Sequence, residues 1–288
     1  NGEAQLIIGT HAVFQKDVEF KQLGLVVIDE QHRFGVEQRL ALVNKGQNEL
    51  HPHQLMMSAT PIPRSLAMSY YADLDVSSID ELPPGRTPIK TLLINNVRRK
   101  EVIKFVQQHA CLGNQAYWVC PLIEESEKLE LENAINTHEE LTNALAPIKV
   151  GLVHGKMKSK DKAEVMADFT ANWTQVLVAT TVIEVGVDVP NASIMVIEHS
   201  ERMGLAQLHQ LRGRVGRGST ESQCVLLYEG NPSEVAKQRL KVISSSNDGF
   251  EIARQDLLIR GPGELLGQRQ SGLPALRFAN LEADLDIL

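Results

Sequence analysis

The sequence predicts an α/β protein with two lobes, each built around a parallel sheet, followed by a helical hairpin. Three observations carry this prediction. Short runs rich in Val, Ile and Leu recur along the chain, helical patterns precede several of them, and a proline-rich segment separates two such series. Continuous apolar runs are typical of strands buried on both faces, and their alternation with helices indicates βαβ units, which place the strands in parallel.

Seven apolar runs are expected to form the strands of the two sheets. Each is short, rich in aliphatic or β-branched side chains, and flanked by polar or turn residues. Helical patterns over residues 97–112 and 159–169 precede the third and the fifth run. The runs span residues 23–28, 54–59, 115–120, 148–153, 175–180, 193–198 and 223–228.

The boundary between the lobes is expected at residues 80–90, where DELPPGRTPIK gathers three prolines and a glycine. We therefore assign residues 1–83 to the carboxyl-terminal part of the first lobe and residues 84–230 to the second lobe. Beyond them the sequence becomes helical, and glycines and a proline at residues 261–263 end the second helical pattern. Residues 231–288 are therefore expected to form a helical hairpin with a tail.

Composition places the chain among ordinary soluble globular proteins. Of its 288 residues, 43% are hydrophobic and 23% charged, and no apolar run approaches the ~18 residues that a membrane span requires. Cys111, Cys120 and Cys224 are widely spaced and form no CxxC pair, so they indicate neither a disulfide framework nor a zinc site. We therefore expect no membrane partner and a location in a reducing cytosol.

The negative net charge of −7 is concentrated in one segment. Residues 124–140 hold seven acids against one lysine, a charge of −6, which leaves the rest of the chain near −1. Residues 202–217, by contrast, hold four arginines and no acid. The overall acidity therefore does not exclude a nucleic-acid partner.

Two carboxylates follow the first apolar run directly. Asp29 and Glu30 fall at its carboxyl end, and in open parallel sheets that edge is where ligands bind. Nucleotide-bound Mg²⁺ keeps several waters and takes only one or two carboxylates plus phosphate oxygens. The pair is therefore a candidate metal site, with Asp29 as the ligand and Glu30 orienting an attacking water. Exposed acids at a helix N-terminus are the alternative explanation.

Polar residues also follow the second apolar run, in SATPIPR at residues 58–64. Ser58 and Thr60 carry hydroxyl groups that can form hydrogen bonds to neighbouring carboxylates, and the prolines fix the exit of the chain. A plain turn after a strand is the alternative.

A basic, glycine-rich segment, QLRGRVGRG, spans residues 210–218. The spacing of three between Arg214 and Arg217 predicts that both lie on one face of a helix. Planar guanidinium groups on a rigid element are suited to clamping the charge that develops on a transferring phosphoryl group. A solvated basic helix face is the alternative, but three glycines within nine residues weigh against a plain surface helix.

Five ordered motifs of the chain resemble those of the superfamily 2 helicases. DEQH, SAT and QLRGRVGR resemble motifs II, III and VI, ATTVIEVGVDVP at residues 179–190 resembles motif V, and GTHA at residues 9–12 resembles motif Ib. The resemblance covers nearly the whole chain. It implies two RecA-like lobes that use ATP and Mg²⁺ and act on nucleic acid.

Longer segments are similar to the RecG family of bacterial branched-DNA translocases. They are DEQHRFGVEQR, residues 58–88, and ARQDLLIRGPGELLGQRQSGLP. The last is similar to the motif that this family shares with the transcription-repair coupling factor Mfd, so an Mfd-like duplex DNA translocase is the alternative. Gln31, where Mfd proteins usually carry a second glutamate, and the long DLDVSSIDELPPGRTP run favour the RecG family.

The resemblance implies which residues handle ATP and Mg²⁺. Asp29 and Glu30 would be the magnesium-binding and water-activating acids, and Gln31 and His32 would complete the catalytic set of motif II. These last two would relay the nucleotide state to Ser58 and Thr60 of motif III. The residues that would reach the nucleotide from the second lobe are Gln210, Arg214 and Arg217, with Asp188 near the ribose.

The resemblance also implies a path for branched or forked duplex DNA. Contacts along it would go to phosphate groups, so binding is expected to be selective for shape and strongly dependent on salt. The path residues are Thr10, His11, Ser58, Thr60, His154, Lys156 and Thr180. The residues that would couple lobe closure to DNA movement are Arg239, Arg260 and Gln270.

The chain holds no phosphate-binding loop of the form GxxxxGK[ST], and the nearest string, GLVHGKM at residues 151–157, has the wrong spacing. The resemblance places this loop and an N-terminal wedge domain upstream of motif Ib. We therefore expect a piece of a longer, monomeric bacterial motor, with the first lobe incomplete. The whole protein is expected to remodel Holliday junctions and stalled replication forks in recombination and repair. By itself this chain is expected to be inactive, and a non-catalytic DNA- or nucleotide-binding module is a further alternative.

Overall fold

The structure is a computed structural model that divides into two compact units, Asn1–Pro61 and Ile62–Leu288. The lobe boundary predicted at residues 80–90 falls within the second unit and stays a prediction. The residues that the structure describes are 4–15, 17–30, 45, 52–58, 75–79, 81, 86–121, 127–180, 189–218 and 220–260.

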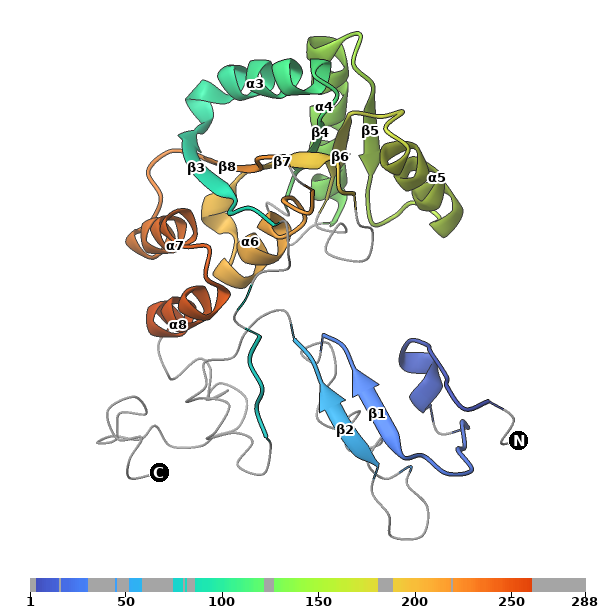
Figure 1. The fold of residues 1–288 in the computed structure, drawn as a ribbon. Helices are drawn as coiled ribbons and strands as arrows, with labels where there is room; N and C mark the ends of the chain where they lie inside the picture. Colours follow the sequence, from blue (N-terminus) through green and yellow to red (C-terminus); the bar gives the residue numbers. More distant parts are fainter. Residues whose placement is uncertain are drawn as a thin grey trace. The chain divides into compact units, whose positions relative to one another are not determined.

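The first unit contains a pair of parallel strands, β1 (Leu25–Ile28) and β2 (His53–Met56), and a short 3-10 helix, η1 (His11–Phe14). Leu25 pairs with His53 and Ile28 with Met56, so both strands end at the same edge (Figure 1). Of the four residues of β1 only Ile28 is buried, whereas Leu25 and Val27 are exposed, so the continuous apolar run does not mark a strand buried on both faces here. Strand β1 ends immediately before Asp29 and Glu30, the two acids of the candidate metal site.

The second unit is built on a six-stranded parallel sheet with the strand order β3-β8-β7-β4-β6-β5 (Figure 1). The central strands are buried along their whole length, which explains their continuous apolar sequences. This sheet confirms the predicted α/β class. Its strands are β3 (Lys90–Asn95), β4 (Gln115–Val119), β5 (Val150–Val153), β6 (Val176–Ala179), β7 (Ala192–Ile197) and β8 (Gln223–Tyr228).

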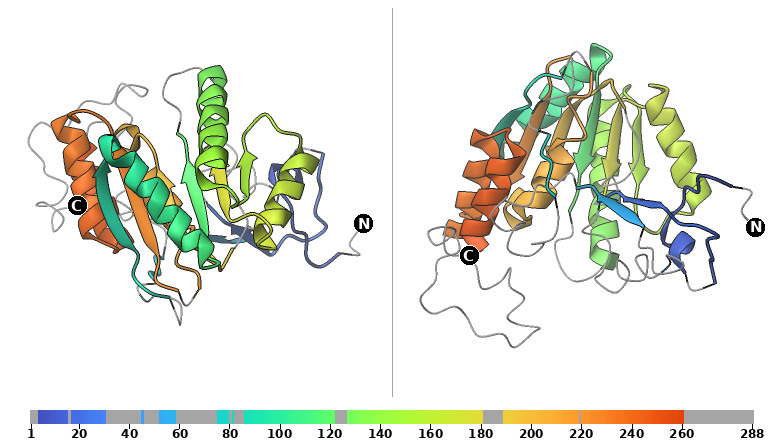
Figure 2. Two further views of the ribbon diagram at one scale, coloured as in Figure 1. Left: turned by 90° about the horizontal axis from the view of Figure 1, so that it is seen from above. Right: turned by 60° about the horizontal axis from the view of Figure 1, so that its bottom comes forward.

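Helices cover both faces of this sheet and bury two separate hydrophobic clusters. One cluster takes residues from α3 and α4, and the other takes residues from α5, α6, α7 and α8. The last two helices pack against each other as the predicted hairpin, drawn in orange and red (Figure 2). The helices are α3 (Arg99–Cys111), α4 (Glu127–Leu145), α5 (Ser159–Thr170), α6 (Leu205–Arg212), α7 (Glu234–Ser245) and α8 (Gly249–Arg260).

The seven predicted strands are all present, each within three residues of its predicted bounds. Strand β3, which follows the proline-rich segment directly, was not predicted. Its six residues, KTLLIN, mix polar and apolar side chains, because β3 is an edge strand and only partly buried. Within the described part of the chain, no helix is long and apolar enough to cross a membrane.

Candidate functional site

The two acids stand directly after β1, at the carboxyl end of the strand. Asp29 is exposed, and its Oδ1 accepts a hydrogen bond from the Glu30 amide nitrogen at 2.9 Å. Glu30 has a φ of +49°, in the left-handed region that L residues other than asparagine and aspartate rarely occupy. Such a conformation costs on the order of 1–3 kcal/mol and concentrates at functional sites.

The strand register brings motif III to the same edge as these acids. The amide nitrogen of Met57 donates to the carbonyl oxygen of Ile28 at 2.8 Å, which extends the ladder one residue past β2. Ser58 is the next residue and is partly buried, so its hydroxyl group belongs to the edge where Asp29 and Glu30 stand. The sequence predicted this arrangement from the two strand ends alone.

The donor set at this edge fits Mg²⁺, because carboxylates and a hydroxyl group supply only oxygen atoms. In the residues that the structure describes, no group of three His, Cys, Asp or Glu side chains is placed so that it could hold a metal ion. Mg²⁺ bound together with a nucleotide needs only one or two carboxylates. Three further residues were predicted beside this site and lie outside the described part of the chain: Gln31, His32 and Thr60.

The prediction that Arg214 and Arg217 share one face of a helix is wrong. Helix α6 ends at Arg212, and both arginines lie in the loop that follows it. Gly213 forms the C-cap of α6, and Gly216 has a φ of +78°, a conformation that a helix cannot contain. Spacing of three residues predicted a helix, but the glycines break it before the first of the two arginines.

The loop after α6 is held in place through its own backbone. The carbonyl oxygen of Gly213 accepts hydrogen bonds from Arg86 Nη2 at 3.0 Å and from Arg217 Nε at 3.4 Å. Arg214 is partly buried, whereas Arg217 is exposed at the loop surface. Gln210 is partly buried on α6, and Asp188 lies outside the described residues. The structure therefore gathers Gln210, Arg214 and Arg217 around the end of one helix.

Gly218→Ala is expected to destabilise the second unit. A β-carbon at this position would collide with the backbone carbonyl oxygen of Pro190, and a backbone atom cannot swing away as a flexible side chain can. We expect a loss of about 1–3 kcal/mol of unfolding free energy, the usual cost of overpacking. Thermal unfolding measures it. Gly24→Ala is the control, because a β-carbon at Gly24 would meet nothing within 4 Å. Equal melting temperatures for the two variants would contradict the close approach.

Three of the residues predicted along the DNA path share the carboxyl edge of the second sheet. His154 and Lys156 follow β5, and Thr180 follows the neighbouring strand β6, with its amide nitrogen donating to the Val153 carbonyl oxygen at 3.2 Å. Thr180 is buried and Lys156 exposed. Burial lowers the pKa of His154, and the charges of Lys162 and Lys156 lower it further, so the neutral form of this imidazole is favoured.

The other predicted DNA and coupling residues are less fully described. Thr10 is exposed and precedes η1, where its carbonyl oxygen accepts from the Val13 amide nitrogen at 3.0 Å. Arg239 lies on α7 and donates from Nη1 to the Met203 carbonyl oxygen at 3.1 Å. The side chains of His11 and Arg260, and the whole of Gln270, lie outside the described part of the chain. Their roles stay predictions.

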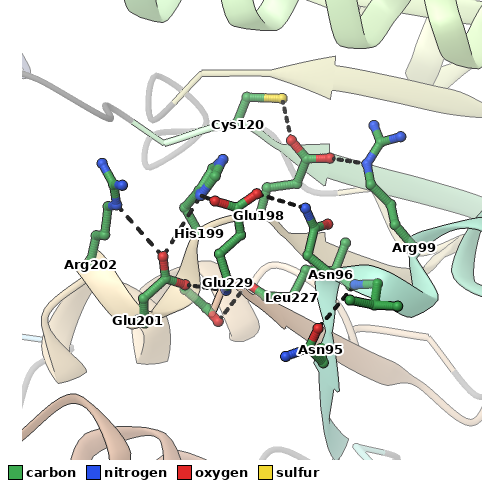
Figure 3. A network of polar contacts seen from close by, with 12 residues as sticks. Asn95, Asn96, Arg99, Cys120, Glu198, His199, Glu201, Arg202, Leu227 and Glu229 are labelled. Atoms are coloured by element: carbon green, nitrogen blue, oxygen red, sulfur yellow. Dashed lines mark hydrogen bonds and ion pairs between the residues drawn. The ribbon is translucent and has the colours of Figure 1, made fainter. Parts of the chain in front are cut away.

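The sequence analysis missed a polar network at the carboxyl ends of β4 and β7 (Figure 3). Glu198 accepts hydrogen bonds from Arg99 Nε at 2.7 Å and from Trp118 Nε1 at 3.0 Å. Arg99 Nη1 also donates to Glu140 of α4 at 2.5 Å. Burial alone would lower the pKa of Arg99, but its ion pairs with Glu198 and Glu140 outweigh burial and raise this pKa. The network fixes α3 and α4 to the sheet beside a polar pocket of about 230 Å³.

Three family models match separate parts of the chain. The DEAD/DEAH box helicase model matches residues 1–69, and the helicase conserved C-terminal domain model matches residues 93–219. A third model, described as ATP-dependent DNA helicase RecG, domain 3, C-terminal, matches residues 246–288. The two helicase models coincide with the predicted positions of motifs Ib to III and of motifs V and VI.

Relatives and solved structures agree with these matches. The chain is 62% identical to ATP-dependent DNA helicase RecG of Escherichia coli (strain K12) and 52% identical to that of Thermotoga maritima. These alignments cover 99% and 100% of this chain but only 41% and 36% of the relatives, so the chain spans about two fifths of their length.

A solved structure of RecG bound to a three-way DNA junction matches all of this chain with a TM-score of 0.74 and 48% identity, and the match covers 36% of that chain. S. cerevisiae Dbp5 bound to RNA and ADP BeF3 matches 87% of this chain, covering 66% of Dbp5, with a TM-score of 0.55 and 13% identity, which shows a shared fold alone. The chain belongs to the RecG family of superfamily 2 helicases.

Proposed function

We propose that this chain is part of an ATP-driven DNA helicase or translocase that acts on branched DNA in recombination and repair, in the bacterial cytosol. The observation that carries the proposal is identity of 62% with a RecG helicase along 99% of the chain, with the acids and arginines of the helicase motifs intact. The similar structure bound to a three-way DNA junction supports branched DNA as the substrate.

The acids at the end of β1 serve nucleotide hydrolysis in this proposal. Asp29 would hold Mg²⁺, which would supply positive charge near the phosphate groups of ATP. Glu30 accepts a hydrogen bond from the attacking water and orients it toward the γ-phosphoryl group. The left-handed turn at Glu30 sets the direction of its carboxylate relative to that of Asp29.

The arginines after α6 serve the same reaction from the second unit. Arg214 and Arg217 stabilise the negative charge that spreads over the γ-phosphoryl oxygens in the transition state, and Gln210 and Asp188 help to bind the nucleotide. The Gly213 carbonyl oxygen, which accepts from Arg86 and Arg217, holds this loop in a defined position. Positioned guanidinium groups cost little reorganisation when the reaction occurs.

The DNA path runs along phosphate groups in this proposal. Lys156 supplies charge, and His154 and the hydroxyl group of Thr10 supply hydrogen bonds. Thr180 is only 2% exposed, so it contributes to this path by its place at the same edge of the sheet. Such contacts carry no sequence information, so affinity falls steeply as salt rises. The coupling residues of the hairpin and tail are Arg239, Arg260 and Gln270.

A second candidate is a binding module that associates with DNA or nucleotide without hydrolysis. The absence of a GxxxxGK[ST] string from these 288 residues favours it for the isolated chain. ATP hydrolysis by the isolated chain that is lost in Asp29→Asn would contradict the module.

The proposed function is tested by dissociation of a synthetic four-way DNA junction. The full-length protein that carries this chain is expected to separate the junction into duplex products only when ATP and Mg²⁺ are present. Asp29→Asn in the same protein is expected to bind the junction and leave it intact. Dissociation without ATP, or equal dissociation by the Asp29→Asn variant, would contradict the proposal.

A further inference from the structure

The side chain of Arg212 is buried at the end of α6, and its hydrogen bonds reach the end of α7. It is only 2% exposed, and Nη1 donates to the carbonyl oxygens of Ile243 at 2.7 Å and Ser246 at 2.8 Å. Ile243 lies in the last turn of α7, and Ser246 is its C-cap. The last carbonyl groups of a helix have no partner within it, so Arg212 satisfies two that α7 and its cap leave open.

Helix α7 compensates the positive charge of Arg212. Burial lowers the pKa of Arg212, yet a guanidinium group stays charged in proteins. Its neighbour His209 adds no second positive charge, because burial and the charge of Arg212 lower the pKa of that imidazole to about 4. Among the described residues no carboxylate forms an ion pair with Arg212, so the negative end of the α7 dipole and its carbonyl oxygens compensate the charge.

This contact lies beside the loop that carries the two motif VI arginines. Arg212 precedes Arg214 by two residues, and between them the Gly213 carbonyl oxygen accepts from Arg86. Helix α6 packs against both α7 and α8. The end of α6 therefore joins three parts of the second unit: the motif VI loop, the segment that enters β3, and the helical hairpin.

We propose that Arg212 is a positioning residue that transmits movement of the motif VI loop to α7 and α8. A buried guanidinium group cannot leave the α7 carbonyl oxygens without losing its compensation, so the ends of α6 and α7 move together. A shift of Arg214 and Arg217 on nucleotide binding is thereby passed to the hairpin. The inference rests on the proposed function and adds a residue that touches neither nucleotide nor DNA.

The test compares ATP hydrolysis with junction migration in the full-length protein. In Arg212→Gln, we expect the KM for ATP to stay close to wild type, while the junction migration obtained per ATP hydrolysed falls at least about fivefold, the lower end of measured couplings between sites. Arg212→Lys keeps the charge and reaches one carbonyl oxygen, so it is expected to recover part of the loss. Arg254→Gln on α8 is the matched control, because Arg254 is half exposed and its ion pair with Glu251 lies at the surface.

A merely structural role gives a different pattern. It predicts a lower melting temperature with equal losses of hydrolysis and migration in both Arg212 variants, and that result would overturn the inference, as would unchanged migration per ATP. Amide hydrogen exchange at the last turn of α7 provides a readout that needs no DNA. A non-hydrolysable ATP analogue should change this exchange in the wild type, to a smaller extent in Arg212→Lys, and not in Arg212→Gln. No change in the wild type overturns the inference, whereas wild-type protein that fails to migrate junctions contradicts only the proposed function.

Discussion

Glu30→Gln, introduced into the full-length protein, is expected to abolish ATP turnover while ATP binding survives. The amide keeps the size of the side chain and a carbonyl oxygen but cannot accept a proton, so the attacking water loses its base. Removal of a general base typically costs about 10²–10⁴-fold in rate. The steady-state kcat for ATP hydrolysis in the presence of DNA and the equilibrium affinity for an ATP analogue measure the two halves of this prediction.

Glu19→Gln is the control for this variant, because Glu19 is an exposed glutamate of the same unit that lies outside the candidate site. It is expected to hydrolyse ATP at the wild-type rate. Unchanged turnover in Glu30→Gln would show that the base lies elsewhere. Loss of ATP affinity together with turnover would instead assign Glu30 to binding the metal and nucleotide.

Arg217→Ala is expected to lower kcat by about 10³-fold or more, the usual range for arginine fingers, with a smaller effect on the KM for ATP. The guanidinium group acts on charge that develops in the transition state, so its removal affects the chemical step more than ground-state binding. Arg217 is exposed, so the melting temperature is expected to change little. Steady-state kinetics and thermal unfolding of the same preparation separate the two effects.

Arg202→Ala removes the same charge from the neighbouring 3-10 helix, Ser200–Arg202, and serves as the control. Its side chain is 45% exposed, pairs with the largely buried Glu201 and lies outside the loop that follows α6, so we expect kcat close to wild type. If Arg217→Ala and Arg202→Ala lowered kcat equally, the effect would come from general charge at this surface and not from a finger.

Much of the second sheet could be predicted because its central strands are buried on both faces. Runs such as VLVA in β6 are apolar throughout, so each of these strands can be recognised from the sequence. The edge strand β3 lacks this signal, since its apolar run is only three residues long and is flanked by Thr91 and Asn95. The end of α6 was mispredicted because the spacing of Arg214 and Arg217 suits a helix, whereas Gly213 and Gly216 decide the backbone.

Some residues of the candidate site could likewise be placed from the sequence, and others could not. Asp29, Glu30 and Ser58 could be placed together because parallel strands bring their carboxyl ends to one edge. Arg99 and Glu198 are 99 residues apart, and no local pattern pairs them. The partners of Arg212 are backbone carbonyl groups 31 and 34 residues away, whose positions depend on where α7 ends. Every residue has a backbone carbonyl group, so the sequence does not indicate which residue accepts such a hydrogen bond.

The central claim is tested most directly by ATP hydrolysis of the full-length protein with a four-way junction, compared with linear duplex of equal length. The account predicts strong preferential stimulation by the junction, because the RecG family assignment implies a motor that engages branched DNA. Equal stimulation by linear duplex would contradict the branched substrate and favour an Mfd-like duplex translocase, and no stimulation by either DNA would contradict the assignment of a DNA motor.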